Sequence, residues 1–355
     1  MNEWISEPVT ETVGALTPVP QAERDRLAEG PEDKVIFAAA FDAIPALRQV
    51  ETGGRASGTP RVRLRVAAWN VERLRYLDDI GDTLAGIDAD VVLLSEIDKG
   101  MARSGNGHRI DELAARLGGA YAYGVEFLEL GLGGPAERAA HDGGANHAGF
   151  HGNGIVSRLP LLRPFMVRLE AEGGWFERDR EEPRVGGRMA IGGQVELAGR
   201  PVTLVSVHLE NRSDAPTRAR HMAHLMTMID RYDAEAPVVI GGDLNSSTFD
   251  WAEAHADPET VAAALAADPW RQLRVADHEP LFGEAVARGY DYEAANVPEA
   301  PTQRFDEPRR FGPAKIDWFF TRGLRAFAPR VVPAVRVDGT PSSDHECLVV
   351  EVELE

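Results

Sequence analysis

Apolar positions along the chain fall into short segments of the length of β-strands. Residues 61–66 alternate polar and apolar side chains, which is typical of a strand with one buried face. Residues 90–95 and 237–241 are short apolar segments that predict buried strands. Residues 188–207 predict a hairpin that turns at residues 198–201, where glycine and proline interrupt the apolar pattern.

The intervening segments complete an alternation of strands and helices. Apolar spacing over residues 73–85, 110–117 and 217–231 predicts helices, and residues 155–157 and 159–167 predict a pair of strands. Because these signals are spread evenly along the chain, they favour one large α/β sandwich over two separate domains.

The first 60 residues differ in composition from the rest. Apolar spacing over residues 32–44 predicts one amphipathic helix. Residues 51–60 are rich in glycine, serine and threonine, which is typical of a linker. We therefore expect an N-terminal extension and linker over residues 1–60, followed by one main domain over residues 61–355.

Charge disfavours one class of partner. The chain has 38 basic and 57 acidic residues, a net charge of -19, which repels polyanions and offers no general patch for the phosphates of a duplex. A bound cation and a few local arginines can reverse the field within one cleft. A nucleic-acid substrate is therefore disfavoured but stays open.

Cysteine content and hydropathy bear on location. Cys347 is the single cysteine, so an internal disulfide or a thiolate metal cluster is excluded. The sequence has no apolar run near the roughly 18 residues that a membrane span needs. Its first residues lack the basic and apolar regions of a secretory signal. These features predict a cytoplasmic protein without a membrane span.

Polar side chains that can bind metal or move protons stand at the ends of the predicted strands. The set comprises carboxylates, imidazoles and amides: Asn70, Glu96, His208, Asp243, Asn245, Asp317, Asp344 and His345. Each of them alone would be an ordinary turn or helix-cap residue. Because they all follow or precede apolar strands, we interpret them as one site assembled from many strands.

This set suits the hydrolysis of a phosphoester. A hard cation such as Mg²⁺ prefers carboxylate and amide oxygens, and it neutralises charge that develops on a phosphate. A further carboxylate orients the attacking water, while an imidazole held by a second acid donates to phosphate oxygens. In Asp243-Leu244-Asn245, an extended backbone places both polar side chains on one face.

Short motifs along the chain resemble, in order, those of the endonuclease/exonuclease/phosphatase superfamily, whose fold is called exonuclease III-like or DNase I-like. The motifs are Trp69-Asn70-Val71-Glu72, Leu94-Ser95-Glu96, Gly152-Asn153-Gly154-Ile155-Val156-Ser157-Arg158, Val207-His208-Leu209, Gly242-Asp243-Leu244-Asn245, Lys315-Ile316-Asp317-Trp318 and Ser343-Asp344-His345. The resemblance implies a four-layer α/β/β/α sandwich with two packed mixed β-sheets. It also implies that residues 61–355 are the catalytic domain of a metal-dependent hydrolase.

The resemblance implies a metal site and its ligands. Glu96 is the principal ligand of Mg²⁺ or Mn²⁺, and Asn70 and Asp344 complete or support the site. Glu72 stands where many nuclease members carry a shorter Asp, so its part in a second metal site stays open. The residues also leave open whether one or two metal ions act.

The resemblance implies catalytic roles for the other members of the set. Asp243 orients or deprotonates the attacking water, and Asn245 positions the phosphate or the nucleophile. His345 faces the scissile phosphate with Asp317 as its orienting acid. His208 is a second phosphate-facing histidine, a general acid or a transition-state donor.

Two further residues are predicted to bind substrate. They are Asn153, within a family motif, and Arg218, which follows the strand of His208. The guanidinium of Arg218 would clamp a nonscissile phosphate, with an ion pair on a helix surface as the alternative. Residues 131–152 and 175–187 resemble the variable loops of the family, so we expect them to choose the substrate.

The leading hypothesis is a divalent-metal-dependent phosphoesterase that hydrolyses a phosphodiester or phosphomonoester. The net charge favours a small-molecule or lipid-type substrate. A magnesium-dependent endonuclease or exonuclease acting on DNA or RNA is the alternative. A noncatalytic binding module of the same fold is less favoured, because every expected polar position is occupied.

Overall fold

Successive side chains of the central strands point into different layers of the molecule. In β4 (Val91–Lys99), Val91 and Leu93 belong to a core that lies between two sheets, whereas Val92 and Leu94 belong to a core beneath helices. This alternation is the two-residue period of a strand covered on both faces. The computed structural model describes residues 6–59, 61–170, 173–176, 182–303 and 313–355.

The larger sheet has nine strands within the described residues, in the order β1-β2-β5-β6-β4-β3-β14-β13, with β8 also paired to β5. It is mixed, since β3 runs parallel to β4 while β4 runs antiparallel to β6. Besides β4, its strands are β1 (Thr12–Val13), β2 (Val50–Gly54), β3 (Leu64–Arg73), β5 (Ala120–Glu129), β6 (Phe150–Ser157), β8 (Arg184–Gly186), β13 (Leu324–Val332) and β14 (Cys347–Leu354).

The smaller sheet has five strands in the order β12-β11-β10-β9-β7. Its strands are β7 (Leu162–Arg168), β9 (Met189–Leu197), β10 (Arg200–His208), β11 (Val238–Asp243) and β12 (Asp317–Arg322). The predicted hairpin is confirmed, because β9 and β10 pair antiparallel across a turn at Ala198 and Gly199.

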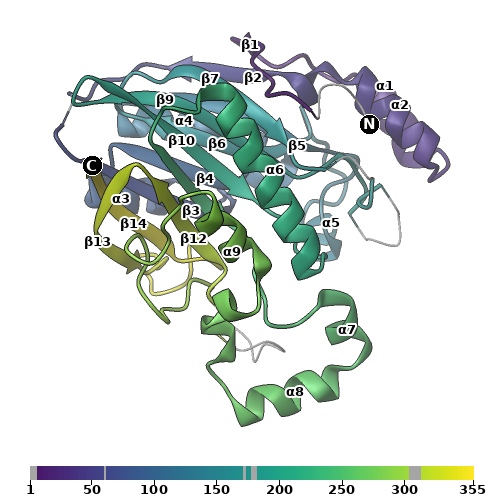
Figure 1. Cartoon of the computed structure of the whole chain (residues 1–355). Helices are drawn as coiled ribbons and strands as arrows, with labels where there is room; N and C mark the ends of the chain where they lie inside the picture. The colour runs from purple at the N-terminus through teal and green to yellow at the C-terminus, as the bar shows by residue number, and fades with distance from the viewer. Residues whose placement is uncertain (1–5, 60, 171–172, 177–181, 304–312) are drawn as a thin grey trace.

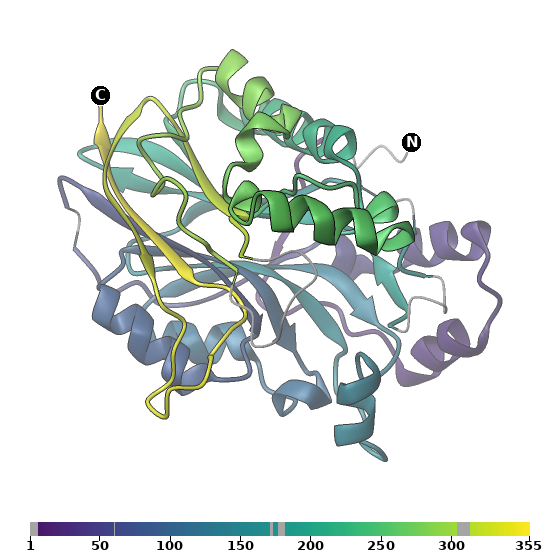
Figure 2. The same cartoon turned by 90° about the horizontal axis from the view of Figure 1, so that it is seen from below.

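Helices cover the outer faces of both sheets, as Figures 1 and 2 show. A core that includes Leu84 and Leu113 lies between the larger sheet and α3 and α4, and a core that includes Leu225 and Phe282 lies between the smaller sheet and α6 and α9. The α7–α8 segment extends away from the sandwich (Figure 1). The helices are α1 (Gln21–Glu29), α2 (Lys34–Ala43), α3 (Leu77–Ile87), α4 (Arg109–Leu117), α5 (Pro135–Ala140), α6 (Ala215–Asp233), α7 (Trp251–Ala256), α8 (Pro258–Ala267) and α9 (Pro280–Ala287).

The order of layers confirms the predicted four-layer α/β/β/α sandwich with two mixed sheets. One pairing was predicted wrongly. The segments predicted to pair, residues 155–157 and 159–167, do not pair with each other, because β6 lies in the larger sheet beside β4 and β5 while β7 pairs with β9 in the smaller sheet. Among the described residues, no helix combines the length and apolar character that crossing a bilayer requires.

The N-terminal segment packs on the larger sheet. Residues 51–54 of the predicted linker belong to β2, which pairs antiparallel with β5 along its whole length. The prediction of a linker is therefore wrong for this part of the segment. Phe41 and Leu47 are fully buried in the core beneath the larger sheet. The division of the chain into domains at residue 60 stays a prediction.

Glu51 ties this segment to the sheet. Its carboxylate accepts hydrogen bonds from the backbone N–H of Leu16 at 2.8 Å and the hydroxyl of Tyr121 at 3.1 Å, and it pairs with Lys99 and His108. Burial alone would raise the pKa of Glu51, but these donors outweigh it and lower the pKa to about 2.

We expect Glu51→Gln to lower the free energy of unfolding by about 2 kcal/mol at pH 7. Because the pKa of Glu51 is depressed in the folded protein, its contribution is present above the ordinary value of 4.5 and is lost as the pH falls toward 2. Urea unfolding at several pH values should therefore show the difference between the two proteins shrinking below pH 4.5.

The matched control is Glu23→Gln, which removes a carboxylate that pairs with Arg26 on the exposed surface of α1. It should change the free energy of unfolding by less than about 0.5 kcal/mol. An equal loss in both variants, or a difference for Glu51→Gln that does not depend on pH, would contradict the assignment.

Candidate active site

The register of the smaller sheet brings three of the predicted residues into one row. His208 at the end of β10 lies opposite Asp243 at the end of parallel β11, and Asp243 lies opposite Asp317 at the start of antiparallel β12. In the larger sheet, Asn70 of β3 lies beside Ser95 of β4, one residue before Glu96. The strand ends of both sheets therefore contribute polar groups to one side of the sandwich.

Asp243 is the point where these groups meet. Its Oδ2 accepts a hydrogen bond from Asn70 Nδ2 at 3.1 Å, and it lies 3.5 Å from His208 Nε2 and 3.7 Å from His345 Nε2. The four side chains come from β3, β10, β11 and the segment before β14. All four are at least 97% buried. One carboxylate oxygen thus links the two sheets.

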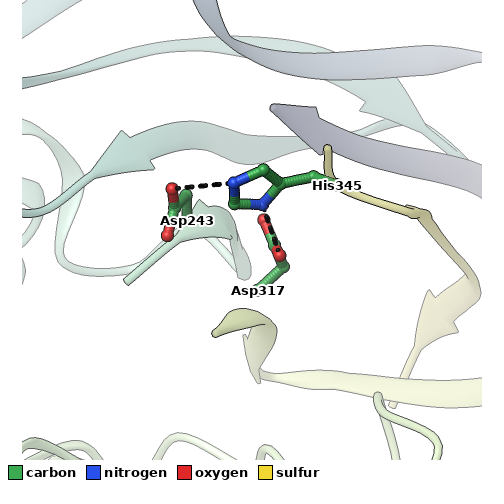
Figure 3. Close-up of side chains that lie close together, drawn as sticks. All are labelled: Asp243, Asp317 and His345. Atoms are coloured by element: carbon green, nitrogen blue, oxygen red, sulfur yellow. Dashed lines mark hydrogen bonds and ion pairs between the residues drawn. The ribbon is translucent and has the colours of Figure 1, made fainter. Parts of the chain in front are cut away.

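His345 lies between the carboxylates of Asp243 and Asp317, as Figure 3 shows. Its Nδ1 hydrogen-bonds to Asp317 Oδ2 at 2.9 Å, and Asp344 Oδ1 lies 3.9 Å from its Nε2. Burial alone would lower the pKa of His345, but the negative charges of Asp317, Asp344 and Asp243 outweigh it and raise the pKa well above 6.5. The surrounding carboxylates therefore favour the protonated form of the His345 imidazole.

Backbone contacts fix this pair in place. The indole N–H of Trp69 donates to the carbonyl oxygen of His345 at 2.8 Å, and the backbone N–H of His345 donates to the hydroxyl of Ser343. The hydroxyl of Thr302 accepts hydrogen bonds from the backbone N–H groups of Ile316 and Asp317, both at 3.0 Å. The imidazole and its orienting acid are thus held independently.

Asp243 has the electrostatics of a base. Burial raises its pKa, and the charge of Asp317 raises it further, whereas His345 and His208 lower it; the net direction is upward. The backbone N–H of Asn245 donates to Asp243 Oδ1 at 2.8 Å, which fixes the carboxylate. A fixed carboxylate with a raised pKa accepts a proton more readily than an exposed one.

The sequence profile of the endonuclease/exonuclease/phosphatase family matches residues 67–345, which contain all of these groups. The chain belongs to this family. No curated protein matches the chain.

Solved structures of similar fold include members of this family. The chain is 20% identical to an endonuclease/exonuclease/phosphatase from Beutenbergia cavernae, with a TM-score of 0.54 over 83% of this chain and 72% of that one. It is 16% identical to a Bacteroides vulgatus endonuclease/exonuclease/phosphatase, with a TM-score of 0.53 over 83% of this chain and 100% of that one. The human Nocturnin catalytic domain with bound sulfate is 14% identical, with a TM-score of 0.53 over 86% and 97% of the respective chains.

These comparisons confirm the predicted superfamily and the DNase I-like fold. Enzymes of the family generally hydrolyse phosphoester bonds with a divalent metal ion. Family membership therefore indicates a metal-dependent phosphoesterase or nuclease.

The acidic residues of the site suit a hard cation. Burial raises the pKa of Glu72, and the negative charges of Asp344 and Glu96 raise it further. The three carboxylates therefore concentrate negative charge beside the amide of Asn70, whose Oδ1 accepts a hydrogen bond from the backbone N–H of Glu72. Carboxylate and amide oxygens are the donors that Mg²⁺ and Mn²⁺ prefer, so the residues present fit such an ion.

A second grouping also has the spacing of metal ligands. Asp243, Asp317 and His345 offer ligand atoms within 4.8 Å of one another. The hydrogen bond between His345 Nδ1 and Asp317 Oδ2 accounts for the closeness of two of these three side chains. Proton transfer by this trio, and a metal at Asn70, Glu96 and Asp344, both stay predictions.

Two other predicted residues have defined partners. Asn245, whose φ is 48°, donates through Nδ2 to the carbonyl oxygen of Leu209 at 3.0 Å. Asn153 is buried in β6 and donates through Nδ2 to the carbonyl oxygen of Met189 at 3.0 Å. Binding of substrate by Asn153 stays a prediction.

Arg218 lies on α6, and its side chain is buried. Its Nε and Nη2 donate to Glu279 Oε1 at 2.9 and 2.6 Å, and its Nη1 donates to the carbonyl oxygen of Ser213. Arg218 thus forms an ion pair, as the alternative prediction had it, although the pair is buried and not on the helix surface. A contact between Arg218 and substrate stays a prediction.

The sequence patterns missed a buried group around His208. Arg188 Nη1 lies 2.9 Å from His208 Nδ1 and 3.3 Å from Glu126 Oε2, and Arg188 Nε donates to Glu210 Oε2 at 2.9 Å. Burial would raise the pKa of Glu126, but Arg188 and His208 outweigh it and lower the pKa to about 2. Glu126 interrupts the apolar run of β5, which was the one signal in the sequence that pointed to it.

We expect Asp317→Asn to lower the pKa of His345, because the variant loses the strongest of the charges that stabilise the imidazolium. The folded pKa of His345 is raised, so its stabilising contribution is complete below pH 6.5 and is lost as the pH rises through the folded pKa. The variant should lose about 2 kcal/mol of unfolding free energy at pH 6, and less in alkaline solution.

NMR titration of the His345 imidazole in metal-free protein gives the direct measurement, and urea unfolding gives the second. Asp338→Asn makes the same substitution in an exposed turn, and it should leave the His345 titration and the free energy of unfolding unchanged. The assignment fails if His345 titrates alike in the wild type and in Asp317→Asn.

Proposed function

We propose that the protein hydrolyses a small phosphodiester or phosphomonoester, with a soluble or lipid-type alcohol as the leaving group, in a reaction that depends on Mg²⁺ or Mn²⁺. The observation that carries the proposal is the convergence of Asn70, His208 and His345 on Asp243. The buried carboxylate of Asp243 can act as a base, and two imidazoles and an amide surround one of its oxygens. These are the groups that an in-line attack of water on phosphorus needs.

The metal would be held by Asn70, Glu96 and Asp344. A divalent ion there supplies charge neutralisation to a phosphate oxygen. Family membership and the concentration of negative charge around Glu72 support this placement.

The remaining side chains handle the proton and the phosphate. Asp243 orients the attacking water and takes its proton, and Asn245 positions the phosphate. His345 is already protonated, so it donates to a phosphate oxygen while Asp317 keeps the imidazole oriented. His208 donates from the opposite side of Asp243, oriented by Glu126 and Arg188.

The walls beside the site favour a small substrate. A cavity of about 380 Å³ is lined by Trp175 and Arg212 together with the carboxylates of Glu170, Glu210, Asp214 and Asp250. Glu210 connects this cavity to the site, because it pairs with the same arginine that contacts His208. An acidic wall repels the successive phosphates of a nucleic acid but accepts a leaving group that is neutral or positively charged.

A second cavity, of about 200 Å³, has Asn245 in its wall. Its other lining residues include Asn211, Phe249 and Trp251, and Arg218, which is paired with Glu279, is the charged side chain that lines it within the described part of the chain. Amide groups and aromatic rings suit a compact polar group. Residues 177–181 of the predicted specificity loops lie outside the described part of the chain.

We expect purified protein with Mg²⁺ or Mn²⁺ to turn over chromogenic phosphodiesters or phosphomonoesters, phospholipids or inositol phosphates faster than supercoiled plasmid or single-stranded DNA. Removal of the metal with EDTA should abolish turnover. Asp243→Asn should lower kcat by at least about 10³-fold, because the variant has no base at the meeting point of the site.

Circular dichroism should show that Asp243→Asn keeps the fold. Asp82→Asn, at an exposed position of α3, is the matched control and should keep full activity. Nicking of plasmid without turnover of any small phosphoester would replace this proposal with a nuclease, and unchanged activity of Asp243→Asn would overturn the assigned site.

A further inference from the structure

Arg73 places a fixed positive charge on the carboxylate that is the proposed principal metal ligand. Its Nη1 lies 2.5 Å from Glu96 Oε2, and its Nε lies 3.1 Å from Glu137 Oε1. The side chains of Arg73 and Glu96 are 21% and 19% exposed, so water screens this ion pair only in part. None of the sequence motifs includes Arg73.

The local backbone explains how Arg73 reaches Glu96. Glu72, Arg73 and Leu74 have φ values of 43°, 68° and 53°, and Glu96 has a φ of 58°. The pairing of β3 with β4 shifts register between Asn70 and Arg73. Left-handed conformations in residues other than glycine persist where surrounding contacts enforce them, and they concentrate at functional sites. This irregular end of β3 directs the guanidinium across the ladder toward Glu96.

The guanidinium is held from its other side as well. Glu137 belongs to α5 and accepts hydrogen bonds from the backbone N–H of Gly134 at 2.9 Å and from Arg103 Nη1 at 3.2 Å. Arg103 is itself fully buried against Asp98, to which it donates through two nitrogens. Arg73 therefore lies between the carboxylates of Glu96 and Glu137. A movement of its side chain away from Glu96 would also break the ion pair with Glu137.

We infer that Arg73 is a built-in counter-ion of the metal site, so that a divalent cation binds Glu96 against the charge of Arg73. This inference rests on the proposed function only in taking Glu96 as a metal ligand. Like charges a few ångströms apart repel strongly in a partly buried site. Arg73 therefore stabilises the acidic cluster in metal-free protein and keeps the metal exchangeable. It acts through Glu96, which makes it a positioning residue.

The test compares stability and metal affinity in Arg73→Met, which keeps the length of the side chain without its charge. The metal-free variant should unfold at lower urea concentration than the wild type, because Glu96 loses its ion pair with Arg73. Its Kd for Mn²⁺, measured by isothermal titration calorimetry without substrate, should be tighter by about tenfold or more. Arg73→Lys keeps the charge, so its Kd should stay within about threefold of the wild type.

Arg75→Met is the matched control. Arg75 lies two residues away and pairs with Glu72 instead of Glu96. A general effect of net charge would tighten metal binding equally in both methionine variants, whereas the ion pair with Glu96 predicts a change below about threefold for Arg75→Met. Arg73→Gln, which removes the charge but keeps a hydrogen-bond donor, gives a second measurement and should bind Mn²⁺ more tightly even if Arg73→Met does not fold.

The inference is overturned if charge-removing variants of Arg73 bind Mn²⁺ no more tightly than the wild type, or if Arg75→Met shows the same gain. If the wild-type protein binds no Mn²⁺, this inference and the proposed function both fail, because both require a metal site at Glu96. Turnover of a phosphoester with unchanged metal affinity in the Arg73 variants would overturn this inference alone.

Discussion

The buried carboxylate of Asp243 is the constraint on which the site and the packing of the two sheets both depend. A buried charge must be compensated by donors with good geometry, or it destabilises the fold. Asn70 supplies that compensation from the larger sheet, and His208 does so from the smaller one. A change in the register of either sheet would move a donor away from Asp243, so the chemistry of the site and the alignment of the sandwich are specified together.

Much of this arrangement could be predicted because its signals are local. The central strands are marked by an alternating pattern or by a short apolar run, and each polar residue of the set lies at or beside the end of such a segment, as Asn70 and His208 do. Partners in a sheet are not local. Residues 155–157 and 162–167 are close in sequence but enter different sheets, because the chain crosses between the two layers after Ser157.

Packing also explains why composition predicted one segment wrongly. The glycines of residues 50–54 are typical of a linker, but a side chain at Gly53 would lie 2.6 Å from the ring of Tyr121, so glycine is what allows this strand to approach β5. Glu126 and Arg188 are equally hidden in the sequence. They are 62 residues apart, and only the fold shows that each compensates the charge of the other beside His208.

Net charge and local charge serve different purposes in this protein. The value of -19 is summed over the whole chain, whereas the site itself holds Arg73, Arg188 and the imidazole of His345 against its carboxylates. A phosphate that reaches Asp243 therefore meets cations and hydrogen-bond donors, while the cavity beyond Glu210 remains acidic. Under the proposed function, this division of charge would admit one phosphate at the centre and oppose a second phosphate next to it, which is the electrostatic requirement for choosing a compact phosphoester over a polyanion.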